Sequence, residues 1–177
     1  MGSAVALKEG VHDRLIQEID HVSAIAKVPV DMIKHSSTEL VGPSVLDWLK
    51  RFKEQRKAGT ASAYLIGKDH KPVDRTMMAS AAVLIRNFID ARVTTLASLL
   101  DGDTDAEEAS VLFVPNFQTG FHGKPLAAWQ VQKLYSLLLD RRVSGKVTVL
   151  YIDSLDELES QYGAAVADHI KDSYTAL

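Results

Sequence analysis

The chain has 177 residues, of which 46% are apolar and 24% charged, and its formal net charge is −3. This composition is typical of a globular domain with a sizeable core, and it excludes a general attraction to nucleic acid or to anionic membranes. Cysteine is absent, which excludes disulfides and thiolate metal sites. No apolar run reaches the roughly 18 residues that cross a bilayer, and the N-terminus lacks a secretory-signal pattern, so we expect a cytoplasmic protein without membrane partners.

The N-terminal segment predicts helices. Apolar residues between 11 and 27 recur at helical spacing, and Pro29 is expected to end that helix. Residues 31–42 are polar and predict a loop. The next helix is expected to begin at Pro43, a residue suited to a first turn, and to end at Gly59. We therefore divide the chain into an N-terminal helical lead-in, residues 1–40, and an α/β domain, residues 41–177.

Apolar runs near 61–66, 110–115 and 147–152 predict buried strands. Between them the patterns predict a helix that begins near Arg75, a short strand and helical turn over 91–103, an acidic surface loop up to 109, and a long helix that ends at Gly145. Ser154 and Glu157 have the spacing of a capping box for the next helix, and a last helix over 164–177 is followed by no expected fifth strand.

Continuous apolar strands alternating with helices favour a parallel sheet that is covered on both faces. Such sheets bind ligands at the carboxyl ends of their strands, which directs attention to Gly67, Pro115 and Asp153. Six apolar side chains are expected to lie in the core: Leu65, Val83, Val111, Phe113, Val149 and Tyr151.

Four segments resemble the AAA+ ATPase domain of bacterial helicase loaders of the DnaC and DnaI type and of the related IstB transposition ATPases. Residues 28–67 resemble the lead-in to the phosphate-binding loop, and 75–93 the first core helix. Residues 111–115 resemble the acid-bearing strand, and 148–170 the sensor strand with its two following helices. This resemblance implies a P-loop NTPase fold, a three-layer parallel sheet in which the first and acid-bearing strands both flank the sensor strand.

The phosphate-binding loop of this family has little support in the sequence. A working loop needs glycines, a lysine and a Ser or Thr hydroxyl for magnesium. The resemblance assigns Gly67, Lys71, Arg75 and Thr76 to a degenerate version of this loop, with Arg75 and Thr76 at the Lys-Thr position. Pro72 removes one N–H donor from it.

The other motifs of the family are also altered. Pro115 and Asn116 stand where the acid pair is expected, Asp153 takes the sensor position, and His169 lies where the family has its arginine finger. We therefore expect no ATP hydrolysis, and we assign no catalytic residue, no metal ligand and no cofactor.

Several residues have a second, structural interpretation. Lys68, His70, Lys71 and Arg75 could bind an anion or form a solvated loop, and Asp153 could cap the next helix. The basic run from Lys50 to Lys57 could meet DNA phosphates or be the wet face of a helix. His122 could contact a partner or be an exposed loop residue. The larger aromatic residues are expected to be packing residues: Trp48, Trp129 and Tyr135.

Three functional hypotheses follow. The first is a non-catalytic AAA+-like protein that binds a protein partner in DNA replication, such as a replicative helicase or an AAA+ loader. The second is an ATP- and magnesium-binding AAA+ ATPase with an atypical phosphate loop. The third is a structural subunit of a larger assembly.

Overall fold

The computed structural model describes residues 5–67, 70–118 and 124–177. Within this part of the chain, five strands form one parallel sheet in the order β2-β3-β4-β1-β5. The strands are β1 (Ala63–Ile66), β2 (Ala91–Val93), β3 (Val111–Val114), β4 (Val147–Ile152) and β5 (Thr175–Ala176). The adjacent, parallel arrangement expected for the three apolar strands is therefore confirmed.

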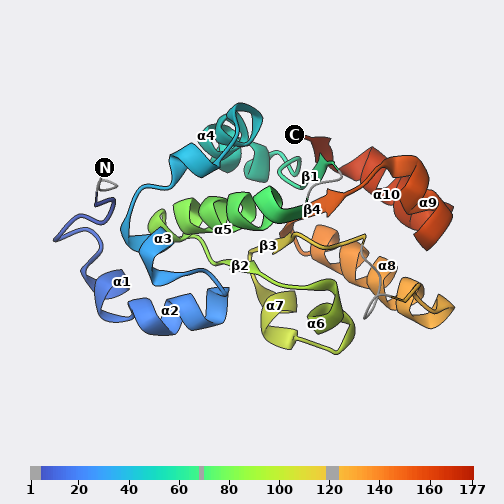
Figure 1. Cartoon of the computed structure of the whole chain (residues 1–177), viewed down its shortest axis with the longest axis horizontal. Coiled ribbons are helices and arrows are strands. Elements are labelled where there is room, and N and C mark those ends of the chain that lie inside the picture. The colour runs from blue at the N-terminus through green and yellow to red at the C-terminus, as the bar shows by residue number, and fades with distance from the viewer. Residues whose placement is uncertain (1–4, 68–69, 119–123) are drawn as a thin grey trace.

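Helices cover both faces of the sheet, as Figure 1 shows. Those of the first half of the chain are α1 (Asp13–Gln17), α2 (Ile19–Ala26), α3 (Val30–Lys34), a 3-10 turn (Thr38–Leu40), α4 (Pro43–Lys57) and α5 (His70–Arg86). Those of the second half are α6 (Leu96–Leu100), α7 (Thr104–Glu108), α8 (Ala128–Val143), α9 (Leu155–Tyr162) and α10 (Ala164–Ser173).

The alternation of side chains along the strands divides the core into two layers. Val111, Phe113 and Val149 face α4 and α5, whereas Leu112 and Leu150 face α8, α9 and α10. This confirms an α/β fold with a parallel sheet between two helical layers. Helices α1 to α3, from the 1–40 segment, bury side chains in the same layer as α4 and α5.

The core prediction holds for four of the six side chains. Val111, Phe113, Val149 and Tyr151 are at most 3% exposed. Leu65 and Val83 are half-buried, and Leu65 packs at the margin of the layer that contains α4 and α5. Trp48 is buried as expected, but Trp129 is 62% exposed near the start of α8 and is not a core residue.

Two local predictions near the N-terminus are wrong. Residues 11–27 form two helices, α1 and α2, because the backbone leaves helical geometry at Glu18. The expected loop 31–42 contains α3 and the 3-10 turn. Helix α3 is stabilised by contacts distant in sequence, since Ile33 is fully buried and Arg86 of α5 donates to carbonyls at the end of α3.

Two other local predictions also fail. The acidic stretch after residue 101 contains α7, whose first turn is capped by the Asp103 side chain through the Ala106 N–H at 3.1 Å. A fifth strand does exist, because Thr175 and Ala176 pair in parallel with Ala63 and Tyr64 of β1. Two residues are too few to produce a periodic pattern in sequence.

A buried arginine joins α8 to the beginning of the sheet. Arg141 is 2% exposed, and its guanidinium donates to Thr148 Oγ1 at 2.9 Å, to the Glu107 carbonyl at 2.7 Å and to the Val147 carbonyl at 2.7 Å. Burial lowers the pKa of Arg141 to about 10, so the side chain keeps its charge at neutral pH. Its role is structural, because it lies at the amino ends of β3 and β4, opposite the candidate site.

Candidate functional site at the carboxyl ends of the strands

The candidate site lies where β1, β3 and β4 end. Gly67 follows β1, residues 115–118 follow β3, and Asp153 follows β4. Because the strands are parallel and adjacent, these segments meet at one edge of the sheet. The structure therefore brings together the three places that the sequence indicated.

Gly67 has a packing reason to be glycine. Its N–H donates to the Ile152 carbonyl at 3.1 Å, which continues the pairing of β1 with β4. A Cβ at this position would lie 2.6 Å from the Tyr151 hydroxyl, and φ of Gly67 is outside the left-handed region. The residue thus leaves space for a tyrosine side chain, a requirement that involves no phosphate.

The connection from β1 to α5 is short. The expectation that the helix begins near Arg75 is wrong, because α5 begins at His70 and residues 67–69 alone separate it from β1. A phosphate-binding loop has about six residues from its first glycine to the glycine before its lysine. Arg75 and Thr76 consequently lie more than one turn inside α5.

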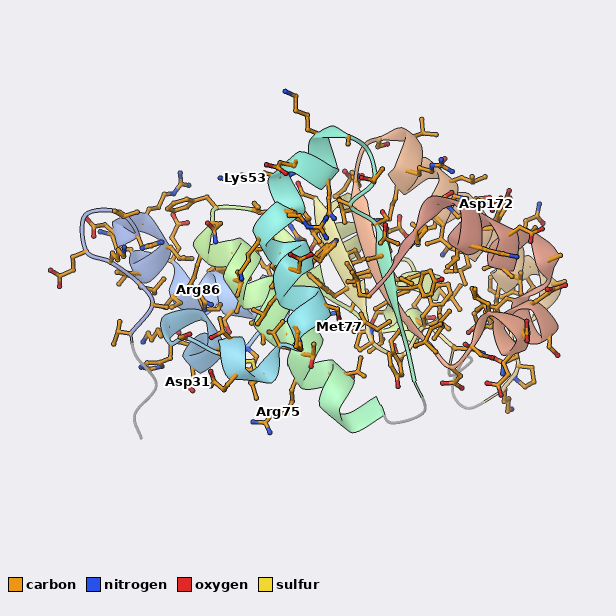
Figure 2. All side chains as sticks on the ribbon, turned by 90° about the horizontal axis from the view of Figure 1, so that it is seen from above. Asp31, Lys53, Arg75, Met77, Arg86 and Asp172 are labelled. Atoms are coloured by element: carbon orange, nitrogen blue, oxygen red, sulfur yellow. The ribbon has the colours of Figure 1, made fainter. Side chains whose placement is uncertain are left out.

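Of the four basic residues proposed for an anion site in this loop, the structure describes the side chain of Arg75 alone. Arg75 is exposed, and Figure 2 shows its side chain directed away from the body of the protein. Lys68 and the side chains of His70 and Lys71 lie outside the described part of the chain. Their assignment to an anion site stays a prediction.

Thr76 is engaged with another part of the fold. Its hydroxyl donates to the Leu40 carbonyl at 2.8 Å and so holds the 3-10 turn against α5. The Thr76 carbonyl accepts a bond from the Ser80 hydroxyl at 2.7 Å. The hydroxyl that the resemblance assigns to magnesium is therefore directed to the lead-in segment.

Amide side chains connect the segments after β3 with their neighbours. Asn116 Oδ1 accepts the Leu96 N–H at 3.1 Å and stabilises the entry into α6. Gln118 is 4% exposed, and its Oε1 accepts the Asp153 N–H at 2.7 Å. Sequence reasoning missed Gln118, although its place four residues after a buried strand was a usable signal.

Asp153 is half-buried between β4 and α9. The helix cap is formed by the next residue, because Ser154 Oγ accepts the Glu157 N–H at 3.1 Å. This confirms the predicted role of Ser154 and removes the capping role suggested for Asp153. The sensor-like role of Asp153 stays a prediction.

His169 has the surroundings of a packing residue. It is 7% exposed, and its ring meets Tyr135 and Tyr174 edge-on at centroid distances of 5.9 and 5.8 Å. Burial lowers the pKa of His169, and the nearby Arg142 charge lowers it further. A ring buried between two tyrosines differs from an arginine finger, which needs an exposed, charged side chain.

His122 lies outside the described residues, so its possible partner contact stays a prediction. Among residues 5–67, 70–118 and 124–177, no group of three His, Asp or Glu side chains could hold a metal ion. In the same ranges, every helix is too short or too polar to cross a membrane.

Among the residues that the structure describes at the strand ends, the arrangement offers the amides of Asn116 and Gln118 and the Asp153 carboxylate. At the positions of the AAA+ motifs that the structure describes, Arg75 stands in place of the lysine that would meet a terminal phosphate. Pro115 and Asn116 stand in place of the acids that would hold magnesium after β3. Compared with models of known protein families and with curated protein sequences, the chain has no significant match.

Proposed function

We propose that this chain is a non-catalytic protein of the AAA+ type that acts by binding another protein. The observation that carries the proposal is the connection between β1 and α5. Residues 67–69 are too few for a phosphate-binding loop, and the Thr76 hydroxyl is bound to the Leu40 carbonyl instead of facing the strand ends.

The family assignment rests on the sheet and on the sequence resemblance together. β1 and β3 both flank β4, which is the arrangement implied for the first, acid-bearing and sensor strands. The partner class comes from the resemblance alone: a replicative helicase or an AAA+ loader. Loss of the nucleotide motifs from an intact sheet favours a scaffold that retains a binding surface.

The test is a titration with ATP and magnesium. We expect no saturable heat below about 1 mM, a limit near −4 kcal/mol, and no steady phosphate release with or without DNA. Because Thr76→Ala also removes the bond to Leu40, Thr76→Ser is the matched variant that keeps a hydroxyl. Micromolar ATP binding, or turnover that Thr76→Ala abolishes and Thr76→Ser retains, would establish the ATPase hypothesis in its place.

A further inference from the structure

A groove runs along α4, first between this helix and α5 and then between the last turns of α4, Ile89 and Gly145. It consists of two adjoining hollows of about 450 and 410 Å³, which share Phe52, Lys53 and Ile89. The groove lies beside α4 and reaches the amino ends of β2 and β4, away from the carboxyl ends of the strands. Figure 2 shows α4 crossing over α5, with Lys53 near one end of α4.

The floor of this α4–α5 groove is aliphatic. Leu46 and Leu49 of α4, Val83 of α5 and the following Ile89 line it, and all four are half-buried. Each therefore retains apolar surface that a bound side chain could cover. Burial of such surface contributes about 25 cal/mol per Å².

The rim of the groove is basic. Lys50, Lys53, Arg56 and Lys57 line one or both hollows and are exposed, and within the described residues none of them forms an ion pair. The acids of α4, Asp47 and Glu54, line neither hollow, and Asp47 pairs with Arg51. The groove is a concentrated positive region on a chain of net charge −3.

We propose that the α4–α5 groove binds an acidic amphipathic helix of a partner protein. The proposal deepens the proposed function, on which it rests, by stating the chemistry of the partner. Apolar residues of the bound helix occupy the aliphatic floor, and its Asp or Glu side chains meet the four cations of the rim. An aliphatic floor with a charged rim of one sign is the arrangement of helix-in-groove recognition.

The dimensions of the groove suit a short helix. The lining residues of α4 extend from Leu46 to Lys57, which corresponds to roughly 18 Å at 1.5 Å per residue. About three turns of helix match this length and present apolar anchors at i, i+3 or i+4, and i+7.

Single-stranded nucleic acid fits the groove less well than a peptide. Sites for single strands combine basic residues with exposed aromatic rings on which bases stack. Phe52 is the aromatic residue among those that line the two hollows, and it is 2% exposed. The floor thus offers contacts to aliphatic side chains instead of a stacking surface.

The experiment selects 16-residue peptides from a displayed random library on the full chain, with excess Lys53→Glu/Arg56→Glu protein as competitor. We expect enriched sequences with negative net charge and apolar residues at the spacing given above. A fluorescein-labelled synthetic peptide with the enriched sequence is expected to bind the Lys53→Glu/Arg56→Glu protein at least tenfold more weakly than the original chain. Binding to the original chain is expected to weaken as salt rises.

The matched control is Arg51→Glu/Lys171→Glu, which changes the net charge equally at exposed positions outside the groove. It should leave peptide affinity within about twofold, and thermal melts verify that both doubly substituted proteins fold.

Three outcomes would overturn the proposal. One is the enrichment of no acidic, apolar-patterned sequence. Another is a labelled single-stranded oligonucleotide that binds more tightly than the peptide and depends on Lys53 and Arg56. The third is self-association of the chain through these residues. ATP binding in the titration described above would refute the non-catalytic function and leave the peptide result standing, so the two failures are distinguishable.

Discussion

The Tyr151 side chain lies so close to Gly67 that it restricts position 67 to glycine. Because a Cβ at Gly67 would lie 2.6 Å from the Tyr151 hydroxyl, Gly67→Ala should destabilise the fold by about 1–3 kcal/mol. Tyr151→Phe removes the hydroxyl that would clash. Gly67→Ala should therefore cost less in the Tyr151→Phe protein than in the original chain. Urea unfolding of the four proteins measures the coupling between the two positions.

Gly42→Ala is the control for this pair, since nothing lies within 4 Å of a Cβ built at Gly42. Because Gly42 is the N-cap of α4, where alanine is less favourable than glycine, the substitution should cost up to about 1 kcal/mol, and equally with tyrosine or phenylalanine at 151. If Gly67→Ala costs the same with tyrosine or phenylalanine at 151, the close approach is not the reason for this glycine.

Helix α3 is an element whose stability depends on another helix. Arg86, near the end of α5, donates to the carbonyls of Met32, Ile33 and His35 at 2.7, 3.3 and 3.1 Å. A cation at the carboxyl end of a helix also interacts favourably with its dipole. Figure 2 marks Arg86 and the α3 residue Asp31 on the same side of the molecule.

Arg86→Met should therefore release α3. We expect faster amide hydrogen exchange in residues 30–36, with α8 to α10 unchanged, and a loss of about 1.5–3 kcal/mol for hydrogen bonds from a charged donor. Arg86→Lys should give an intermediate effect because one ammonium replaces a planar fork. Arg75→Met, on an exposed part of the same helix, is the control. Unchanged exchange in α3 would show that Ile33 packing alone holds it.

At the scale of the whole molecule, His169 links stability to pH. Burial lowers the pKa of His169 in the folded state, whereas in the unfolded chain the same ring has its ordinary pKa of about 6.5. As pH falls below about 6.5, the unfolded state takes up more protons, and the free energy of unfolding decreases until the folded ring is also protonated. Tyr135 and Tyr174 pack against the ring, the Arg142 charge also opposes its protonation, and the Asp172 carboxylate favours protonation less strongly.

Denaturant melts between pH 5.5 and 7.5 check this expectation. His169→Phe keeps an aromatic ring between the two tyrosines and should flatten the dependence on pH. His21→Gln, at an exposed position, should leave it unchanged. Equal slopes for the original chain and His169→Phe would assign the effect to other groups.

Much of the fold was predictable because the central strands are apolar almost throughout, with Thr148 as the polar residue of β4. Residues 111–114 and 147–152 are buried throughout, so their pattern alone indicates a sheet that is covered on both faces. The long helices α4 and α8 also have the expected periodicity and stop signals. The Ser154 cap was predictable as well, because it depends on residues three positions apart.

The sequence by itself determined which segments form the central strands and that the nucleotide motifs of the AAA+ family are missing from it. The tertiary structure decided the rest, because those features depend on contacts between distant residues. Pairing with β1 makes a strand of Thr175 and Ala176, and Arg86 stabilises α3. Leu40 engages the Thr76 hydroxyl. Packing of α4 against α5 converts the basic run from Lys50 to Lys57 into one side of a groove with an aliphatic floor.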